Sequence, residues 1–290
     1  MSALLPVVSS AASTVFVSER LDGPTGSGDF LWLDGNQKIT AGNGTYLAPQ
    51  PNAFSLVQIE DCPMSTPTCR ASCYVHGLEA TAKTTHDLYR HNSATLRRIF
   101  TAPDSSAGYL ADQPAGRWWA RTLGAWIEAH ARGGFRWHVS GDLFDPSYAC
   151  WVARVVEQSP SVRHWIYTRS HAFSAAFVGV PNITVNYSVD VDNYEAARPY
   201  AAAHAAIGEP VRLAYMVTGD GHVPADLPPD SVLFPDYALR GVRGAWFQGL
   251  PAHQKKMVCP TDIGGKSERR RCGPCTRCIR PAGVSAREYM

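Results

Sequence analysis

Long hydrophobic runs are absent from this sequence of 290 residues. No stretch approaches the roughly 18 consecutive apolar residues that a membrane-spanning helix needs, so we expect no membrane partner. No basic residue precedes Arg20, so the N-terminus also lacks the charged start of a secretory signal. We therefore expect a cytoplasmic protein whose reduced cysteines bind metal; disulfide pairing is the alternative that this compartment disfavours.

An excess of charge of one sign is absent as well. The net charge is +2, which gives the whole molecule no strong electrostatic preference for nucleic acid or membrane. Neither GxGxxG nor GxxxxGK[ST] occurs in the strand-to-helix context that phosphate binding requires, which argues against a doubly wound nucleotide-binding sheet. No nucleophile–base pair can be recognised, so the sequence leaves open whether the protein is an enzyme.

Cysteine, in contrast, is concentrated in two places. Seven of the eight cysteines lie in clusters near opposite ends of the chain: Cys62, Cys69 and Cys73, then Cys259, Cys272, Cys275 and Cys278. Thiolates two or three residues apart can surround one metal centre, because a tight turn points their sulfurs inward. We predict that all seven are metal ligands.

The C-terminal spacing indicates which metal. Three cysteines at successive x2 intervals, with Cys259 further off and Pro260 directly after it, match ferredoxin-type spacing. Structural zinc more often uses two Cys-x2-Cys pairs. We therefore expect an iron–sulfur cluster, most readily of the 4Fe–4S type, with zinc as the alternative.

The number of metal sites is left open by the sequence. The first cluster supplies three thiolates, and a fourth metal corner without a protein ligand would bind a substrate or cofactor directly. Alternatively, one C-terminal cysteine completes this site and the chain holds a single cluster.

Strand-like and helix-like segments alternate from residue 54 onward. The expected strands are 54–60, 135–141, 162–170, 182–190, 211–218 and 231–237, and the expected helices are 85–100, 116–134, 146–159, 171–179 and 193–208. Such alternation predicts a parallel sheet with right-handed crossovers. We expect an α/β fold over residues 53–250, as a partial or closed (β/α) barrel of the TIM type. Residues 1–52 are expected to form an irregular N-terminal arm, and residues 251–290 a Cys-rich metal-binding segment packed on the barrel mouth.

Several reactive side chains follow these strands. Parallel α/β folds bind ligands at the carboxyl ends of their strands, so we expect a small-molecule site there with Ser140, Gly141 and Asp142 as cofactor-binding residues. Asp142 is also a candidate catalytic carboxylate; a turn or cap is the alternative, although Asp145 is the better capping residue.

Arg169 is the second catalytic candidate, because its planar fork suits a carboxylate or phosphate. A surface salt bridge is the interpretation that we favour for it. Asp190 and Asp192 are expected either to hold a polar ligand or to end a strand. His138 is expected to be a core histidine.

Three consecutive arginines, Arg269, Arg270 and Arg271, give the strongest indication of nucleic-acid binding. A basic run beside metal-binding cysteines can contact phosphates, although we favour a solvated loop. The rival function is therefore a zinc-stapled nucleic-acid-binding protein without catalysis.

The ordered motifs resemble a known family. Between Asp61 and Ile279 the chain has Cys-Pro…Cys-x3-Cys-Tyr, a strand ending HVSGDLF, a strand ending YTRS, and Cys-Pro…Cys-x2-Cys-x2-Cys. This combination is similar to the phage gene-product-88 family. The resemblance implies a bacteriophage origin, from an actinobacterial host, and hence a location in the host cytoplasm; it implies no particular reaction.

A more distant resemblance is to the radical S-adenosylmethionine enzymes. These place a three-cysteine loop after the first strand of a partial (β/α) barrel and a Gly-Gly-Glu-like motif after the second. Ser140-Gly141-Asp142 is similar to that motif, and the resemblance implies that Asp142 meets the methionine amine of S-adenosylmethionine.

The cysteine loop departs from the pattern of those enzymes. Their usual Cys-x3-Cys-x2-Cys is replaced by Cys69-x3-Cys73-x2-His76, with Cys62 upstream. Either Cys62 is the third ligand or this cofactor is not bound. The leading expectation is thus an iron–sulfur protein on a radical-SAM-like barrel, with the cluster at its mouth and redox or S-adenosylmethionine-type chemistry.

Overall fold

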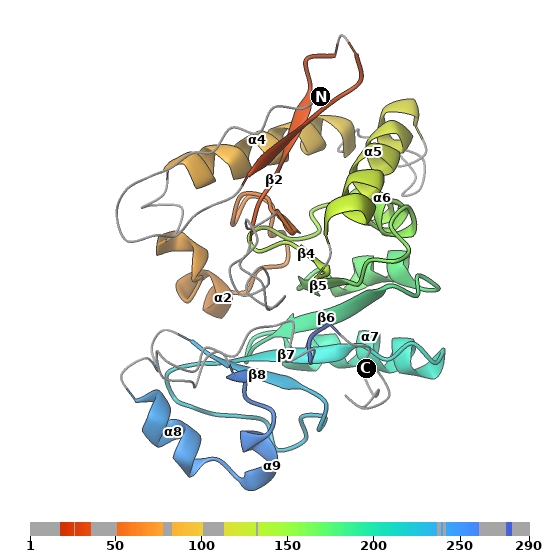
Figure 1. Cartoon of the computed structure of the whole chain (residues 1–290). Helices are drawn as coiled ribbons and strands as arrows, with labels where there is room; N and C mark the ends of the chain where they lie inside the picture. The colour runs from red at the N-terminus through yellow and green to blue at the C-terminus, as the bar shows by residue number, and fades with distance from the viewer. Residues whose placement is uncertain are drawn as a thin grey trace.

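Six parallel strands form the main sheet of the protein and lie side by side in sequence order (Figure 1). The computed structural model describes residues 18–25, 27–35, 51–77, 83–100, 113–131, 133–236, 239, 242–260 and 277–279. The strands are β3 (Ala53–Phe54), β4 (Phe135–Trp137), β5 (His164–Thr168), β6 (Ile183–Val189), β7 (Arg212–Val217) and β8 (Val232–Pro235). The prediction of an α/β fold with a parallel sheet is confirmed.

The strand order determines how the chain winds. Each strand pairs with the next one in sequence, from β3–β4 to β7–β8. Right-handed crossovers that always step in one direction leave their connections on one face. The sheet is therefore wound like the wall of a barrel and not doubly around a central strand.

A closed barrel, which the sequence allowed, does not form among the described residues. The outer edge of β8 is occupied, because Leu233 N donates to Met257 O and Cys259 N donates to Leu233 O, each at 2.9 Å. Val258 thereby makes a parallel bridge to Leu233. The sheet stays open, with β3 at its other edge.

Helices pack on one face of this sheet. Those between the strands are α4 (Lys83–Phe100), α5 (Pro114–His130), α6 (Pro146–Glu157), the 3-10 helix η1 (His171–Phe177) and α7 (Tyr194–Ala206), and two later ones are α8 (Arg243–Gly249) and α9 (Ala252–Lys255). Trp137 and Ile166 of the sheet share one buried core with Trp151 of α6. Tyr187 and Leu213 belong to a second core, beside α7. Among the described residues, no helix combines the length and apolar character needed to cross a bilayer.

The opposite face of the sheet is concave. Tyr167 on β5 and Phe234 on β8 meet edge to face with ring centroids 5.9 Å apart, although β6 and β7 lie between them. Three strand spacings on a flat sheet amount to about 14 Å, so the sheet must curve to bring these rings together. Arg136 of β4 lies over the same Tyr167 ring, 5.1 Å from its centroid.

The first two strands of the sheet are shorter than predicted. β3 ends at Phe54 because the following amides bond elsewhere: Leu56 N donates to Ser140 O at 3.0 Å, and Val57 N donates to Ser93 Oγ at 2.9 Å. β4 ends at Trp137 because His138 adopts a left-handed φ of 57°, which leaves the extended conformation. The segments after β3 and β4 therefore both leave the sheet before the predicted ends of the strands.

A two-stranded antiparallel hairpin lies against α4. It consists of β1 (Glu19–Asp22) and β2 (Phe30–Leu33). Asn92 of α4 holds β2 by accepting from Trp32 N at 2.8 Å and donating to Trp32 O at 2.9 Å. The chain then reaches Asp34, whose backbone bridges to Ala53 at the start of the main sheet.

Asp34 places a carboxyl group in the core, with 2% of the residue exposed. Its Oδ2 accepts hydrogen bonds from Ser55 Oγ at 2.9 Å and from Tyr89 OH at 3.3 Å, and within the described residues Oδ1 has no partner. Burial raises the pKa of this carboxyl from 3.8 to about 6, against a smaller lowering by the two hydroxyl groups.

Asparagine at position 34 is expected to raise the free energy of unfolding at pH 7 by about 3 kcal/mol, the energy equivalent of this pKa difference. The folded carboxyl binds its proton more tightly than the unfolded one, so its stabilising contribution is largest below about pH 4 and is lost as the pH rises through about 6. Urea unfolding across this range should show the variant and wild-type stabilities diverging toward neutral pH. Asp22→Asn on the exposed hairpin is the control, and a pH-independent difference for Asp34→Asn would contradict the prediction.

Candidate metal centre at the carboxyl edge of the sheet

The first cysteine cluster lies on a segment that crosses the carboxyl ends of several strands. This cysteine segment, residues 62–74, contains the short helix α2 (Pro67–Ala71). Thr66 caps the helix by accepting a hydrogen bond from Cys69 N at 3.0 Å. The Thr66 hydroxyl also donates to Asp190 Oδ2 at 2.6 Å, just beyond β6. The cap of the cysteine helix is therefore fastened to a strand end.

Further contacts fasten the cysteine segment to the sheet. Ser72 Oγ donates to Asp236 Oδ2 at 3.0 Å, beyond β8, and Tyr74 OH donates to the Val139 carbonyl, beyond β4. Asp192 Oδ2 accepts from the backbone amide of Thr68 at 2.9 Å. The segment thus spans the mouth of the curved sheet from β4 to β8.

The three thiols of the segment, on Cys62, Cys69 and Cys73, share one neighbourhood and are all partly buried. Burial raises the pKa of Cys62 most, and the charges of Asp142, Cys69 and Cys73 raise it further. Burial also raises the pKa of Cys69, whereas the positive charge of Arg169 lowers it. The Asp142 carboxylate therefore lies close enough to the Cys62 and Cys69 thiols to raise the pKa of both.

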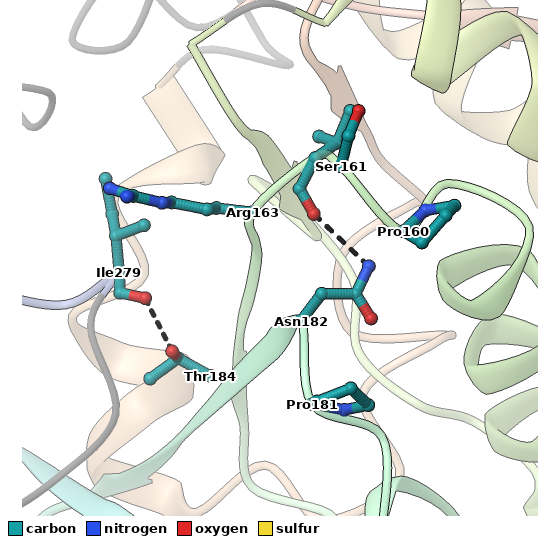
Figure 2. A pocket seen from close by; sticks show the side chains of 8 residues that line it. Pro160, Ser161, Arg163, Pro181, Asn182, Thr184 and Ile279 are labelled. Atoms are coloured by element: carbon teal, nitrogen blue, oxygen red, sulfur yellow. Dashed lines mark hydrogen bonds between the residues drawn. The ribbon is translucent and has the colours of Figure 1, made fainter. Parts of the chain in front are cut away.

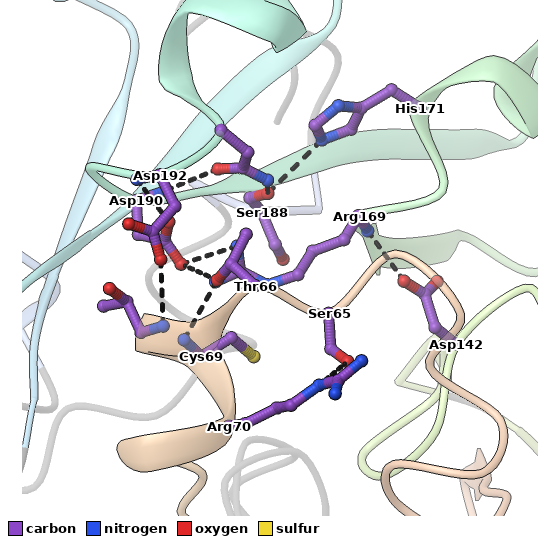
Figure 3. A network of polar contacts seen from close by, with 12 residues as sticks. Ser65, Thr66, Cys69, Arg70, Asp142, Arg169, His171, Ser188, Asp190 and Asp192 are labelled. Atoms are coloured by element: carbon purple, nitrogen blue, oxygen red, sulfur yellow. Dashed lines mark hydrogen bonds and ion pairs between the residues drawn. The ribbon is translucent and has the colours of Figure 1, made fainter.

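Arg169 and Asp190 form a buried ion pair beside the cysteine helix (Figure 3). Arg169 Nη1 lies 2.8 Å from Asp190 Oδ2, and the two side chains are 9% and 0% exposed. The surface location favoured from the sequence is therefore wrong. Both charges are enclosed because the cysteine segment covers them through the Thr66 contact.

The predicted cofactor-binding residues Ser140, Gly141 and Asp142 follow β4 and support the cysteine segment. Asp142 N donates to Asp61 O at 2.8 Å, immediately before the segment. The Asp142 oxygens accept from two backbone amides at 2.7 Å each, one of them Arg169 N. Burial raises the pKa of Asp142 from 3.8 to about 6. The bond from Arg169 N ties the end of β5 to the Asp142 carboxyl group beyond β4, and the Thr168 side chain also hydrogen-bonds this carboxyl group.

Gly141→Ala is expected to lower the free energy of unfolding by about 3 kcal/mol. Gly141 has a φ of +77°, and a Cβ there would lie 2.5 Å from Leu56 Cβ. Left-handed strain of roughly 1–2 kcal/mol is therefore joined by the displacement of a buried leucine. Gly179→Ala is the matched control, because Gly179 has a φ of +78° with nothing within 4 Å of its Cβ position. Equal losses for the two variants in urea unfolding would show that the Leu56 contact contributes nothing.

The second cysteine cluster lies partly outside the described residues, which do not include Cys272, Cys275, Arg269, Arg270 or Arg271. Cys259 N bonds to the outer edge of β8, as described above. Cys278 O accepts from Asn186 Nδ2 at 3.0 Å, within β6. Asn186 precedes Asp190 by four residues, which is about 13 Å of extended strand. The backbone of Cys278 therefore lies well along the sheet from the cysteine segment.

A cavity of about 250 Å³ lies at the amino ends of β5 and β6 (Figure 2). Ile279 forms one wall, and its carbonyl accepts from Thr184 Oγ1 at 2.5 Å. Asn182, on another wall, already donates to three backbone carbonyls. The cavity thus lies where Ile279 meets the sheet.

Within the described part of the chain, no three His, Cys, Asp or Glu side chains converge where one metal ion would bind. The thiols of the cysteine segment are neighbours without forming a cage for a single ion. Thiolates are soft donors, which suit zinc or iron–sulfur clusters.

Sequence reasoning missed two residues that build this site. Thr66 had a local signal, because threonine directly before a proline is typical of a helix N-terminus. Arg97 of α4 had none: its Nε lies 2.5 Å from Oδ1 of the fully buried Asp61. His138 is a core histidine as predicted, with Nε2 2.9 Å from Tyr148 OH.

Comparison with known proteins identifies a family but no solved structure. The family described as Gene product 88 matches residues 30–281. The Gene 88 protein of Mycobacterium phage L5 is 28% identical over 172 residues, which cover 57% of this chain and 64% of the relative. That of Mycobacterium phage D29 is 27% identical over 172 residues, which cover 57% of this chain and 63% of the relative. The chain thus spans less than two thirds of either relative, and no solved structure matches it.

Proposed function

The chain belongs to the Gene product 88 family and is related to proteins of mycobacterial phages, and we propose that it binds an iron–sulfur cluster through Cys62, Cys69 and Cys73. The predicted bacteriophage origin is supported by these relatives. One observation carries the proposal: the three thiols lie together across the carboxyl edge of a parallel sheet. Parallel α/β folds bind their ligands at that edge.

The donor atoms are the reason for preferring a cluster to a single ion. Thiolates are the usual ligands of iron–sulfur clusters, and the cysteine segment brings three of them into one neighbourhood. Zinc is the alternative metal for the same residues.

We propose that one iron of this cluster has no protein ligand. The cysteine segment offers three thiols, and the backbone of Cys278 is held by Asn186 further along β6. That position favours a separate C-terminal site over a fourth ligand to the first. A small molecule can bind the cluster directly only at an iron that has a coordination position without a protein ligand.

The winding of the sheet supports an S-adenosylmethionine-type role for that open position. A three-cysteine segment directly after the first strand of a singly wound sheet is the arrangement of radical S-adenosylmethionine enzymes, and we propose that this sheet is their partial barrel. When bound, such a cluster supplies an electron to its ligand. Asp142 holds the ends of β4 and β5 in place, and the contacting rings of Tyr167 and Phe234 form part of the concave face below the segment.

Anaerobic purification with analysis of iron, zinc and acid-labile sulfide tests the proposal. We expect iron with matching sulfide, and an electron paramagnetic resonance (EPR) signal of the reduced protein that changes when S-adenosylmethionine is added. Zinc without sulfide would overturn the iron–sulfur assignment. Iron and sulfide without a response to S-adenosylmethionine would leave a structural or electron-transferring cluster.

A further inference from the structure

We propose that residues 277–279 form a releasable strap, which covers aromatic side chains on the concave face of the sheet and excludes a ligand from them until it is displaced. The ligand that this surface suits is an aromatic molecule with acceptor oxygens. The inference goes beyond the proposed function, because it concerns the middle of the sheet and not the cysteine segment at its carboxyl edge.

The strap lies on the concave face over β5 and β6. Thr184 of β6 is the register partner of Trp165 of β5. Asn186 is the partner of Tyr167, two residues further along. Side chains two residues apart on a strand share a face, so these four side chains all lie on the concave side with Tyr167. Ile279 of the strap packs in one buried cluster with Trp165 and Tyr167.

Two backbone carbonyls of the strap accept hydrogen bonds from this face. The Ile279 carbonyl accepts from Thr184 Oγ1 at 2.5 Å (Figure 2). The Cys278 carbonyl accepts from Asn186 Nδ2 at 3.0 Å. Both donors stand on β6, whose backbone is already paired with β5 and β7. The sheet therefore holds these donors in place without help from the strap.

The buried anchor of the strap is packed unevenly. Ile279 is 5% exposed and contacts Trp165, which is 1% exposed. Ile279 also lines the cavity of about 250 Å³ at the amino ends of β5 and β6. Atoms that face a void lack the dispersion contacts of a filled core. The cavity therefore weakens the hold on Ile279, which suits a segment that can be released.

Release of the strap would uncover a surface with a definite chemistry. The rings of Trp165 and Tyr167 would be exposed beside the Thr184 hydroxyl and the Asn186 amide. Aromatic rings pack well against other aromatic rings. The two donors would lose the carbonyl oxygens that they now bind, and buried polar groups need partners. An aromatic molecule with acceptor oxygens meets both requirements, and the strap carbonyls stand in for its oxygens.

Trypsin cleavage of the full chain after Arg277, followed by mass spectrometry, measures release of the strap. Native-state cleavage reports the population of the open form, and Arg277 directly precedes the two anchored residues. Ile279→Asp places a charge against Trp165 and is expected to speed this cleavage at least about tenfold. Thr184→Val keeps the shape of the side chain and removes one hydrogen-bond donor, so an increase of about fivefold is expected.

Binding of 8-anilinonaphthalene-1-sulfonate tests the uncovered surface, because this dye is an aromatic molecule with acceptor oxygens. Ile279→Asp is expected to bind more dye than wild type while keeping a cooperative thermal transition, which distinguishes release from a molten core. Ile207→Asp is the matched control, because Ile207 is 56% exposed directly after α7; it should change neither readout. Wild-type cleavage rates in both strap variants would overturn the releasable strap. Faster cleavage without added dye binding would overturn the ligand surface beneath it.

Discussion

Cys69→Ser is expected to remove the iron that we propose the cysteine segment binds. Serine replaces a soft thiolate by a hydroxyl that stays protonated near neutral pH and that is a poor ligand for iron–sulfur clusters. Cys69 is also closely constrained, because its amide bonds to Thr66 and its sulfur lies beside Arg169. Iron and sulfide at this site should fall by at least about tenfold, the scale reached even when a partner of a metal ligand is lost. Wild-type amounts of both in Cys69→Ser would contradict the assignment.

A parallel set of variants determines the number of clusters. Cys278→Ser removes a predicted ligand of the second site, and Cys150→Ala is the control, because that partly buried thiol packs against the core. Partial losses of iron in Cys69→Ser and Cys278→Ser that add up to the whole indicate two sites. Complete loss of iron in each of the two single variants indicates one cluster that both cysteines bind. Cys150→Ala should keep all of its iron.

The order of strands and helices could be predicted because most elements carry their own hydrophobic period. The expected strand 182–190 contains β6, and the expected helix 85–100 lies within α4. The first strand shows the limit of this reasoning. Leu56 and Val57 are buried like strand residues, but their amides bond to Ser140 and Ser93. An apolar run predicts burial, and burial does not specify the hydrogen-bond partner.

Closure of the sheet could not be predicted for a different reason. A barrel closes when its first and last strands pair, and no local pattern records that contact. In this chain the outer edge of β8 is taken by the backbone around Val258, which lies beyond two intervening helices. The order of strands along the chain is the same for an open sheet and for a closed barrel, so it does not distinguish them.

The location of the thiols followed from topology, but the contacts that hold them did not. A loop after the first strand of a parallel sheet must lie at its carboxyl edge, which places Cys69 near the edge residues. Thr66 and Asp190 are 124 residues apart, and each had an adequate local explanation as a cap or a strand end. Arg169 was assigned to the surface because its sequence context shows a charge and does not show what covers it.

Asp190→Asn is expected to lower the free energy of unfolding by about 3–5 kcal/mol, because it leaves a buried guanidinium without its counter-charge. Asp190 is fully buried and the Arg169 side chain is 9% exposed, so solvent screens the pair little. Asparagine has nearly the same shape and can still pair with the Thr66 hydroxyl. The thermal midpoint should fall by about 6 °C or more.

A double variant decides whether this loss comes from the unpaired charge. Arg169→Met combined with Asp190→Asn removes both charges and is expected to recover most of the stability, since buried pairs are often replaced by neutral groups at little cost. Glu195→Gln is the control: it breaks a pair with Arg198 whose side chains are 78% and 50% exposed, and it should cost less than about 1 kcal/mol. A double variant as unstable as Asp190→Asn would mean that the charge of Arg169 is not the cause. The loss of stability would then come from the second acceptor oxygen of the carboxylate, because an amide has a single acceptor oxygen for Asp192 N and the Thr66 hydroxyl.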